Sequence, residues 1–140
     1  MNRLFLDTNV VLDLLGARAP WFRDMARIAS MADRGELQLF TSAMTLGTTD
    51  YFLSKEMSPA VSREKLRKFK LLCKVAPMDD SCVAKALESP FKGLEDALQH
   101  QCALDAGCDL ILTRNPKDFR KSALPVLSAE AFLIRLKLQP

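Results

Sequence analysis

The sequence predicts an α/β protein, a three-layer α/β/α sandwich with a short, mostly parallel central sheet. Short apolar runs alternate with longer segments whose apolar residues recur at helical spacing. The first run, Leu4–Leu6, has no polar alternation, as is typical of a strand buried on both faces. Strands separated by helices pair in parallel through right-handed crossovers, which place helices on both faces of the sheet.

The N-terminal half is expected to contain two of the strands and four helices. Each helix follows a turn or a capping residue; Ser42, for example, can accept hydrogen bonds from the first turn of the helix after it, and Pro59 suits a first turn. The expected elements, in order, are a strand over Leu4–Leu6, a helix from Thr8 to Leu15, a helix over Trp21–Ala32, a strand over Leu37–Phe40, a helix over Met44–Leu53 and a helix from Pro59 to Cys73.

The C-terminal half is expected to continue the alternation. Asp79 can cap one helix, and Gly107 can terminate another. The expected elements are a strand over Cys73–Ala76, a helix over Val83–Leu87, a helix over Leu94–Ala106, a strand over Asp109–Thr113, a polar loop over Arg114–Phe119, a strand over Val126–Leu127 and a closing helix that Ser128 caps.

Composition sets the broad class of the protein. The 140 residues are 49% hydrophobic, which is enough for one core, so we expect a single domain over residues 1–140. The formal net charge of +3 neither requires nor excludes a nucleic-acid partner. The four cysteines lack metal-site spacing and are expected to be buried free thiols. With no run long enough to span a bilayer, we expect a cytoplasmic protein with no membrane partner.

Three aspartates are candidate functional residues because they fall at the carboxyl ends of strands or the starts of the following helices, where parallel sheets bind ligands. They are Asp7, Asp96 and Asp118. Each also has a purely structural explanation, since Asp7 could cap a helix, Asp96 could face the positive end of a helix dipole and Asp118 could stabilise a turn. Three carboxylates meeting in one crevice would need a cation, and oxygen ligands suit Mg²⁺ or Mn²⁺.

Four segments together resemble the PIN domain of VapC-type toxin ribonucleases, in the same order along the chain. They are Leu6–Asp13, Thr41–Leu46, Glu95–Gln99 and Thr113–Phe119. The resemblance implies Mg²⁺- or Mn²⁺-dependent endonucleolytic cleavage of RNA. It also implies that Asp7, Asp96 and Asp118 form the metal site, that Asn115 is a polar catalytic residue, and that a small antitoxin protein is a partner. A second copy of the chain is a further possible partner.

One position departs from the family pattern. The pattern places a glutamate three residues after the threonine of the second segment, where this chain has Thr48. Asp13, Asp50 or Glu95 could supply the missing carboxylate. The departure leaves open a second function, a PIN domain that binds RNA or a protein without cutting. A third reading, phosphotransfer through Asp7 as in haloacid-dehalogenase-like phosphatases, is disfavoured because Asn9 stands where that family has a second aspartate.

Basic residues next to the last motif are expected to bind RNA phosphates near the metal. They are Arg114, Lys117, Arg120 and Lys121. A second basic run, from Arg63 to Lys74, is expected to be a solvated helix face. His100 could share a helix face with Asp96 and act as a base, although a partly buried structural role is favoured.

Overall fold

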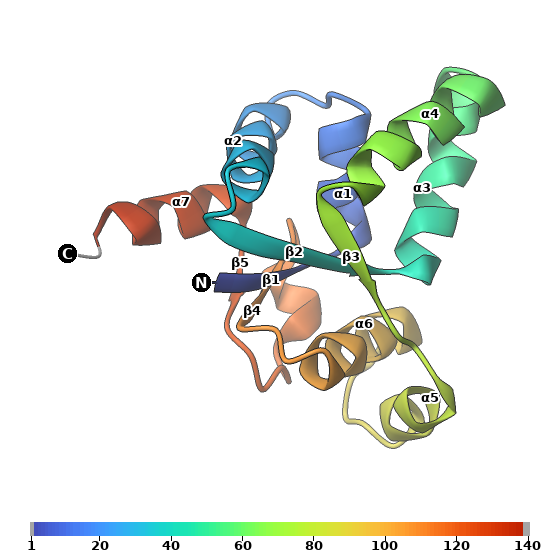
Figure 1. Ribbon diagram of the computed structural model, residues 1–140. Coiled ribbons are helices and arrows are strands. Elements are labelled where there is room, and N and C mark those ends of the chain that lie inside the picture. Colours follow the sequence, from blue (N-terminus) through green and yellow to red (C-terminus); the bar gives the residue numbers. More distant parts are fainter. Residues whose placement is uncertain (1, 139–140) are drawn as a thin grey trace.

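The architecture is a three-layer α/β/α sandwich, as predicted (Figure 1). A computed structural model describes residues 2–138. Its central sheet has five strands, all parallel, in the order β3-β2-β1-β4-β5. The strands are β1 (Asn2–Leu6), β2 (Leu37–Ser42), β3 (Cys73–Ala76), β4 (Leu110–Leu112) and β5 (Val126–Leu127).

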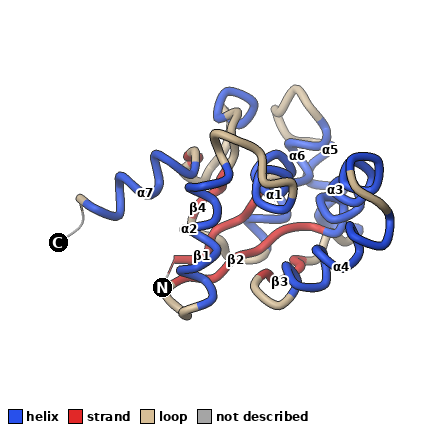
Figure 2. Tube along the Cα trace, turned by 90° about the horizontal axis from the view of Figure 1, so that it is seen from above, coloured by secondary structure: helices blue, strands red, loops and turns tan. Residues whose placement is uncertain are grey.

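Within residues 2–138, seven α-helices cover the two faces of the sheet (Figure 1). They are α1 (Thr8–Leu15), α2 (Phe22–Asp33), α3 (Ala43–Glu56), α4 (Pro59–Lys70), α5 (Asp80–Leu87), α6 (Leu94–Asp105) and α7 (Ala129–Lys137). Seen from above, α1 lies between α2 and α3 (Figure 2). Helices α5 and α6 lie on the opposite face of the sheet from these three (Figure 1).

Alternate residues of β1 point to opposite faces of the sheet and contribute to two hydrophobic clusters, one on each face. Leu4 and Leu6 belong to the hydrophobic cluster under α1, α2 and α7, whereas Phe5 belongs to the cluster under α5 and α6. Phe5 is in register with Phe40 on β2 and Ile111 on β4, which face the same side. Leu4, Phe5 and Leu6, the last three of the five residues of β1, are completely buried, which explains why this run has no polar alternation.

Local capping followed the predicted chemistry. Ser42 accepts a hydrogen bond from the Thr45 N–H at 3.2 Å, and Asp79 accepts one from Cys82 at 2.9 Å. Gly107, just past α6, has φ of +70°, a conformation that glycine adopts without strain. These residues fix where the helices begin and end.

Three local predictions were wrong. The helix after Ser58 ends at Lys70, so Cys73 belongs to β3 alone. Strand β2 continues through Ser42 because its ladder with β3 extends to that residue. The expected polar loop contains a 3₁₀ helix, η1 (Pro116–Phe119), which proline can begin because its missing N–H is not needed there.

The four predicted thiols lie in the interior of the protein. Cys73, Cys82, Cys102 and Cys108 are free and buried, and burial raises the pKa of Cys73 and Cys102 to about 12. Within residues 2–138, no helix is both long enough and apolar enough to traverse a bilayer.

Candidate active site

Asp7 lies where β1 ends and α1 begins. It caps α1, since its Oδ1 accepts a hydrogen bond from the Thr8 N–H at 2.9 Å. Its Oδ2 accepts a hydrogen bond from the Thr113 hydroxyl, at the end of the neighbouring strand β4, at 2.8 Å. The hydrogen bonds of Asp7 cap the helix and also fix its carboxylate at the crevice between β1 and β4. Capping therefore does not exclude a functional role for this residue.

Gln99 supports Asp7 from the other side, and sequence reasoning gave it no role. Its side chain is 1% exposed, and its Nε2 donates to the Thr45 hydroxyl at 2.6 Å and to Asp7 Oδ1 at 3.4 Å. Its Oε1 accepts from the Ser42 hydroxyl at 2.6 Å. Gln99 thus joins α6, β2 and α3 to Asp7. Its position one helical turn after Asp96 was the available signal.

Asp96 is in the first turn of α6, beside Gly93 at the helix N-cap. A Cβ on Gly93 would lie 3.0 Å from Asp96 Oδ2, so any larger residue at this position would force the carboxylate to shift. The pKa of Asp96 is raised to about 6, first by burial and then by the negative charges of Asp7, Asp118 and Glu95. The carboxylates of this region therefore act electrostatically on one another.

Asp118 and Asn115 come from the segment after β4. Asn115 precedes η1, its backbone N–H donates to the Thr113 hydroxyl at 3.2 Å, and Asp118 lies within η1. Thr113 therefore holds both this segment and Asp7. The structure brings together the predicted acids and Asn115, because they line a single cavity of about 210 Å³ with Glu95 among its walls.

The cavity has the ligand chemistry of a hydrated Mg²⁺ or Mn²⁺ site. Across residues 2–138, no ion pair neutralises Asp7, Glu95, Asp96 or Asp118. Within the same residues, no group of three or more histidine, cysteine, aspartate or glutamate side chains is spaced as a preformed metal site. Mutual repulsion favours such separation, and Mg²⁺ usually keeps several waters while binding one or two carboxylates. The donor set therefore fits a cation that retains much of its water.

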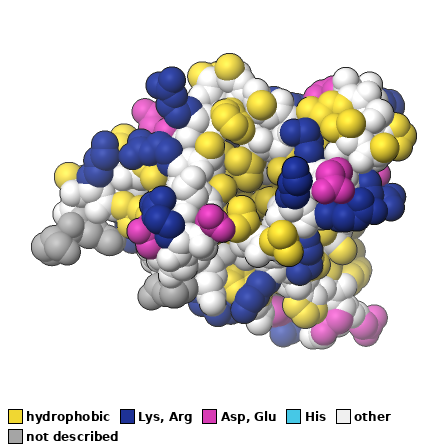
Figure 3. Space-filling view, turned by 45° about the horizontal axis from the view of Figure 1, so that its top comes forward, with side chains coloured by type: hydrophobic (Ala, Val, Ile, Leu, Met, Phe, Trp, Pro, Cys, Tyr) yellow, Lys and Arg dark blue, Asp and Glu magenta, His cyan; other side chains and the backbone are white. Residues whose placement is uncertain are grey.

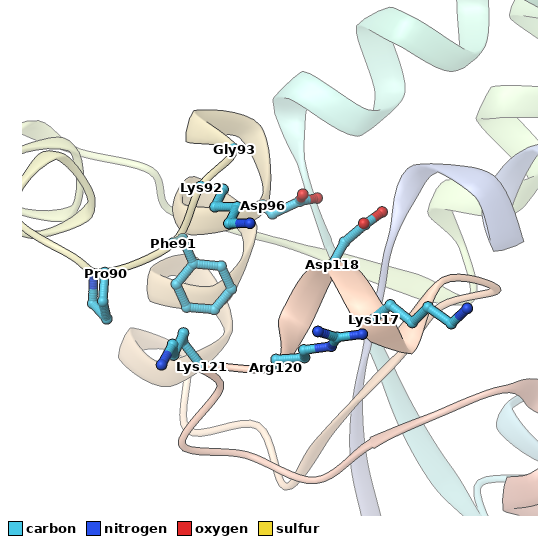
Figure 4. Close-up of a pocket in the computed structure, with 9 residues that line it drawn as sticks. All are labelled: Pro90, Phe91, Lys92, Gly93, Asp96, Lys117, Asp118, Arg120 and Lys121. Atoms are coloured by element: carbon cyan, nitrogen blue, oxygen red, sulfur yellow. The ribbon is translucent and has the colours of Figure 1, made fainter.

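A larger pocket, of about 750 Å³, adjoins the acidic cavity and shares Asp96 and Asp118 with it. Figure 4 shows these two carboxylates toward one edge of the pocket and Arg120 and Lys121 at the opposite edge. Lys117 also lines the pocket, although its side chain extends away from the other labelled groups (Figure 4). Three of the four predicted RNA-binding residues thus border the acidic site.

Arg114, the fourth of these, has partners within the protein. Its Nε donates to Asp13 Oδ2 at 2.8 Å, and its guanidinium lies 3.9 Å from the centre of the Trp21 ring. Asp13 is completely buried. Asp13 and Arg114 therefore neutralise each other, and neither lines the acidic cavity.

Thr48 and Asp50 lie on helix α3; together with Asp13 and Glu95 they are the four auxiliary candidates, the residues considered in connection with the missing carboxylate. Asp50 accepts hydrogen bonds from the hydroxyls of Ser54 at 3.3 Å and Ser62 at 2.7 Å, which joins α3 to α4. Thr48 does not line the acidic cavity, but Met44, one helical turn before it, does. Among the four auxiliary candidates, only Glu95 lines the cavity.

His100 makes a structural contact. It is 8% exposed, and its Nε2 accepts a hydrogen bond from the Ala123 N–H at 3.0 Å, which requires an unprotonated nitrogen. Burial lowers its pKa from the ordinary value. A structural role is therefore the better explanation of this residue.

Comparison with known proteins identifies related sequences. The sequence profile of a family described as PIN domain matches residues 3–117. Ribonuclease VapC1 from Aquifex aeolicus is 30% identical over 140 residues, which cover 96% of this chain and 95% of that protein.

Solved structures share the fold at low sequence identity. VapBC from Salmonella typhimurium, bound to DNA, matches with a TM-score of 0.69 and 17% identity, covering 92% of this chain and 99% of that one. VapBC2 from Rickettsia felis, bound to a promoter DNA fragment, matches with a TM-score of 0.68 and 17% identity, covering 90% and 97%. VapC20 from Mycobacterium tuberculosis, a toxin that cleaves the sarcin–ricin loop, matches with a TM-score of 0.62 and 15% identity, covering 77% and 86%.

Proposed function

This chain belongs to the PIN-domain family, and we propose that it is an endoribonuclease that hydrolyses RNA phosphodiester bonds with Mg²⁺ or Mn²⁺. The observation that carries the proposal is the acidic cavity at the carboxyl ends of β1 and β4, whose carboxylates have no cation partner in residues 2–138. The name of the Aquifex aeolicus relative supports the same activity.

Asp7, Asp96 and Asp118 would hold the cation, and Asn115 would orient a water, a carboxylate or a phosphate oxygen. When bound, a divalent cation lowers the pKa of water and polarises phosphoryl oxygens. The protein contributes position: Thr113 and Gln99 hold the Asp7 carboxylate in place. Gly93 leaves space for Asp96. Glu95, on the cavity wall, could accept a proton from an attacking water.

Phosphates of the RNA would be bound by the cations beside the acids. Lys117, Arg120 and Lys121 are exposed and line the adjoining pocket, and Lys92 on its rim joins them. Carboxylates and cations on opposite edges of one pocket would place a phosphodiester between them (Figure 4). Such phosphate contacts make binding fall with rising salt concentration.

A second function is favoured by Thr48, which leaves the pattern one carboxylate short. In that case the domain would bind RNA or a protein without cutting. The two functions differ in whether a purified sample breaks the phosphodiester bond, since both allow binding.

The deciding experiment is cleavage of a mixed RNA substrate with Mg²⁺, with Mn²⁺ and with a chelator. We expect wild type to cut only with metal, and Asp7→Asn to be inactive yet folded, because asparagine retains a capping oxygen. Asp50→Asn is the matched control, since Asp50 bonds only hydroxyls of α3 and α4. Equal cleavage by Asp7→Asn would refute the proposed site, whereas metal-dependent RNA binding without cleavage would establish the second function.

We further propose that the chain is the toxin of a toxin–antitoxin pair and binds a small antitoxin, with a homodimer as a further assembly. The VapBC structures with which it shares a fold support this. Hydrophobic side chains also gather over α2 and α4 on one face, with lysines and arginines around them (Figure 3). Phe22 on α2 and Val61 on α4 are 38% and 46% exposed.

Expression in a bacterial host tests the pairing. Wild type should arrest growth, Asp7→Asn should not, and the product of a small neighbouring gene should both restore growth and form a complex with the chain. Sedimentation of the purified chain would give its oligomeric state. Growth arrest by Asp7→Asn equal to that by wild type would contradict the toxin proposal.

A further inference from the structure

The large pocket beside the acids contains an aromatic ring that the proposed chemistry does not use. Phe91 lies in the segment between α5 and α6 and lines this pocket together with Pro90 and several charged residues. Its ring lies between the carboxylate edge and the Arg120 and Lys121 edge in Figure 4. The pocket volume of about 750 Å³ is within the range of sites that bind small ligands.

Phe91 packs against two other aromatic rings. Its ring centre lies 4.8 Å from that of His100, with the planes tilted by 32°. Phe119 meets it edge to face, with the ring centres 6.0 Å apart and the planes at 75°. His100 is itself fixed by the Ala123 N–H. One face of Phe91 is thus covered by His100, while the residue still lines the pocket.

The charges around the ring suit a nucleotide. Lys92, Arg120 and Lys121 are exposed and line the same pocket, so an apolar platform lies among groups that bind phosphate. An aromatic ring in a basic groove is the usual means by which proteins bind single-stranded nucleic acid. A platform already fixed in place loses little conformational entropy when a base stacks on it.

We propose that this pocket binds one nucleotide of single-stranded RNA beside the scissile phosphate, with its base stacked on Phe91 and its phosphate held by Arg120 and Lys121. The inference rests on the proposed ribonuclease function and specifies its substrate. Bases within a duplex are already stacked and paired, so the platform selects unpaired segments and loops. Purines, which have the larger ring surface, are preferred at this position.

The test combines protein variants with altered substrates. The scissile bond in a single-stranded RNA is first mapped, and RNAs are then made with one abasic nucleotide at each of the three positions on either side. Values of kcat and KM are measured for wild type, Phe91→Leu, Phe91→Tyr and the control Phe52→Leu. Phe52 also makes an edge-to-face contact, with Tyr51 on α3, and does not line the pocket. Thermal melting checks that all variants are folded.

We expect Phe91→Leu to lower kcat/KM about tenfold, mostly through KM, because one base stack is lost. Phe91→Tyr and Phe52→Leu should stay near wild type. At one position an abasic nucleotide should slow wild type about tenfold but slow Phe91→Leu little further, since both changes remove the same contact. Additive losses at every position, or wild-type kinetics for Phe91→Leu, would overturn the platform and leave Phe91 as a packing residue.

If the wild-type protein cuts no RNA, the ribonuclease function is refuted. The cleavage assay then does not tell whether a base stacks on Phe91. Binding then decides it, with the same RNAs carrying the fluorescent base 2-aminopurine, whose emission falls when it stacks. Quenching by wild type and Phe91→Tyr but not by Phe91→Leu would support the platform. Equal signals from wild type and Phe91→Leu, including no signal from either, would overturn it.

Discussion

Two groups of carboxylates lie near the same end of the sheet, and they differ in what neutralises them. Asp13 is completely buried, and Arg114 lies 2.8 Å from its Oδ2, with Trp21 against the guanidinium. Burial raises the pKa of Asp13, and the charge of Arg114 opposes that rise. Asp96, by contrast, lies among other carboxylates, and its pKa is raised to about 6, first by burial and then by the negative charges of Asp7, Asp118 and Glu95.

The difference separates an acid that the fold itself neutralises from the acids that we propose to be functional. An acid whose charge the protein neutralises is accounted for by the fold, as with Asp13. Carboxylates that surround a small cavity without a cation repel one another, and this repulsion destabilises the folded protein unless a cation binds in the cavity. Although Asp7 and Asp13 belong to one short segment, only Asp7 lines that cavity.

The largest expected effect comes from breaking the neutralised pair. Arg114→Met leaves the buried Asp13 without its cation, and Asp13 Oδ1 already has no hydrogen-bond partner within residues 2–138. We expect the free energy of unfolding to fall by about 3 kcal/mol. Denaturant titration measures this, and the double variant Asp13→Leu/Arg114→Met should recover most of the loss. A loss below about 1 kcal/mol in Arg114→Met would mean that the pair is not structural.

A smaller effect, on activity more than stability, should follow from displacing an acid of the cavity. Gly93→Ala adds a Cβ 3.0 Å from Asp96 Oδ2 and should lower cleavage about tenfold, because one atom misplaced in a site is costly. Gly47→Ala on α3 is the matched control, since its Cβ would meet nothing within 4 Å. Cleavage rates and melting temperatures of both variants are compared. Equal rates would show that the position of Asp96 is unimportant.

Replacing Thr48 with glutamate should increase the affinity of the acidic cavity for a divalent metal. Side chains on a helix lean toward its N-terminus, so a glutamate at position 48 should reach toward Met44, which lines the cavity. The added carboxylate should raise affinity for Mg²⁺ several-fold and increase cleavage, with Mn²⁺ preferred by the wild type. Metal titration and cleavage assays compare the two proteins. If Thr48→Glu changes neither while Glu95→Ala abolishes activity, Glu95 has taken over the role.

The smallest expected effect concerns pH and lies outside both acid groups. Because burial lowers the folded-state pKa of His100, its contribution to stability is present above the unfolded pKa of about 6.5 and is lost as pH falls through the folded value. Wild type should therefore lose stability on acidification more steeply than His100→Gln, which keeps an acceptor for Ala123. Thermal melts at several pH values measure this. At neutral pH, His100→Gln should retain most activity, and parallel pH profiles would contradict the assignment.

The sequence was sufficient for most of the fold because the signals were local. Capping by Ser42 and Asp79, the unbroken apolar run of β1 and the glycine after α6 each act within a few residues. The 3₁₀ helix η1 was missed because its polar sequence also suits an open turn. The acids could be proposed from their places at strand ends and from the family resemblance.

Other parts of the site depend on contacts that no local pattern contains. Arg114 and Asp13 are 101 positions apart, so their pairing is visible only in the folded chain. Gln99 lies in the segment Glu95–Gln99 that resembles the PIN domain, but the residues that it contacts, Ser42 and Thr45, belong to a distant part of the sequence. Phe91 lies before α6, in a stretch whose apolar residues show no helical or strand periodicity. The position of Phe91 in the pocket follows from the packing of α6 against η1.

Asp7, Asp96 and Asp118, which have no cation partner within residues 2–138, are proposed to bind a divalent metal. Calorimetric titration of Mn²⁺ into metal-free protein tests this proposal most directly, with wild type, Asp7→Asn, Asp96→Asn and the control Asp50→Asn measured side by side. We expect saturable binding to wild type and Asp50→Asn, and binding at least tenfold weaker in the other two variants. Absence of Mn²⁺ binding to wild type, or unchanged affinity in Asp7→Asn and Asp96→Asn, would contradict the proposal.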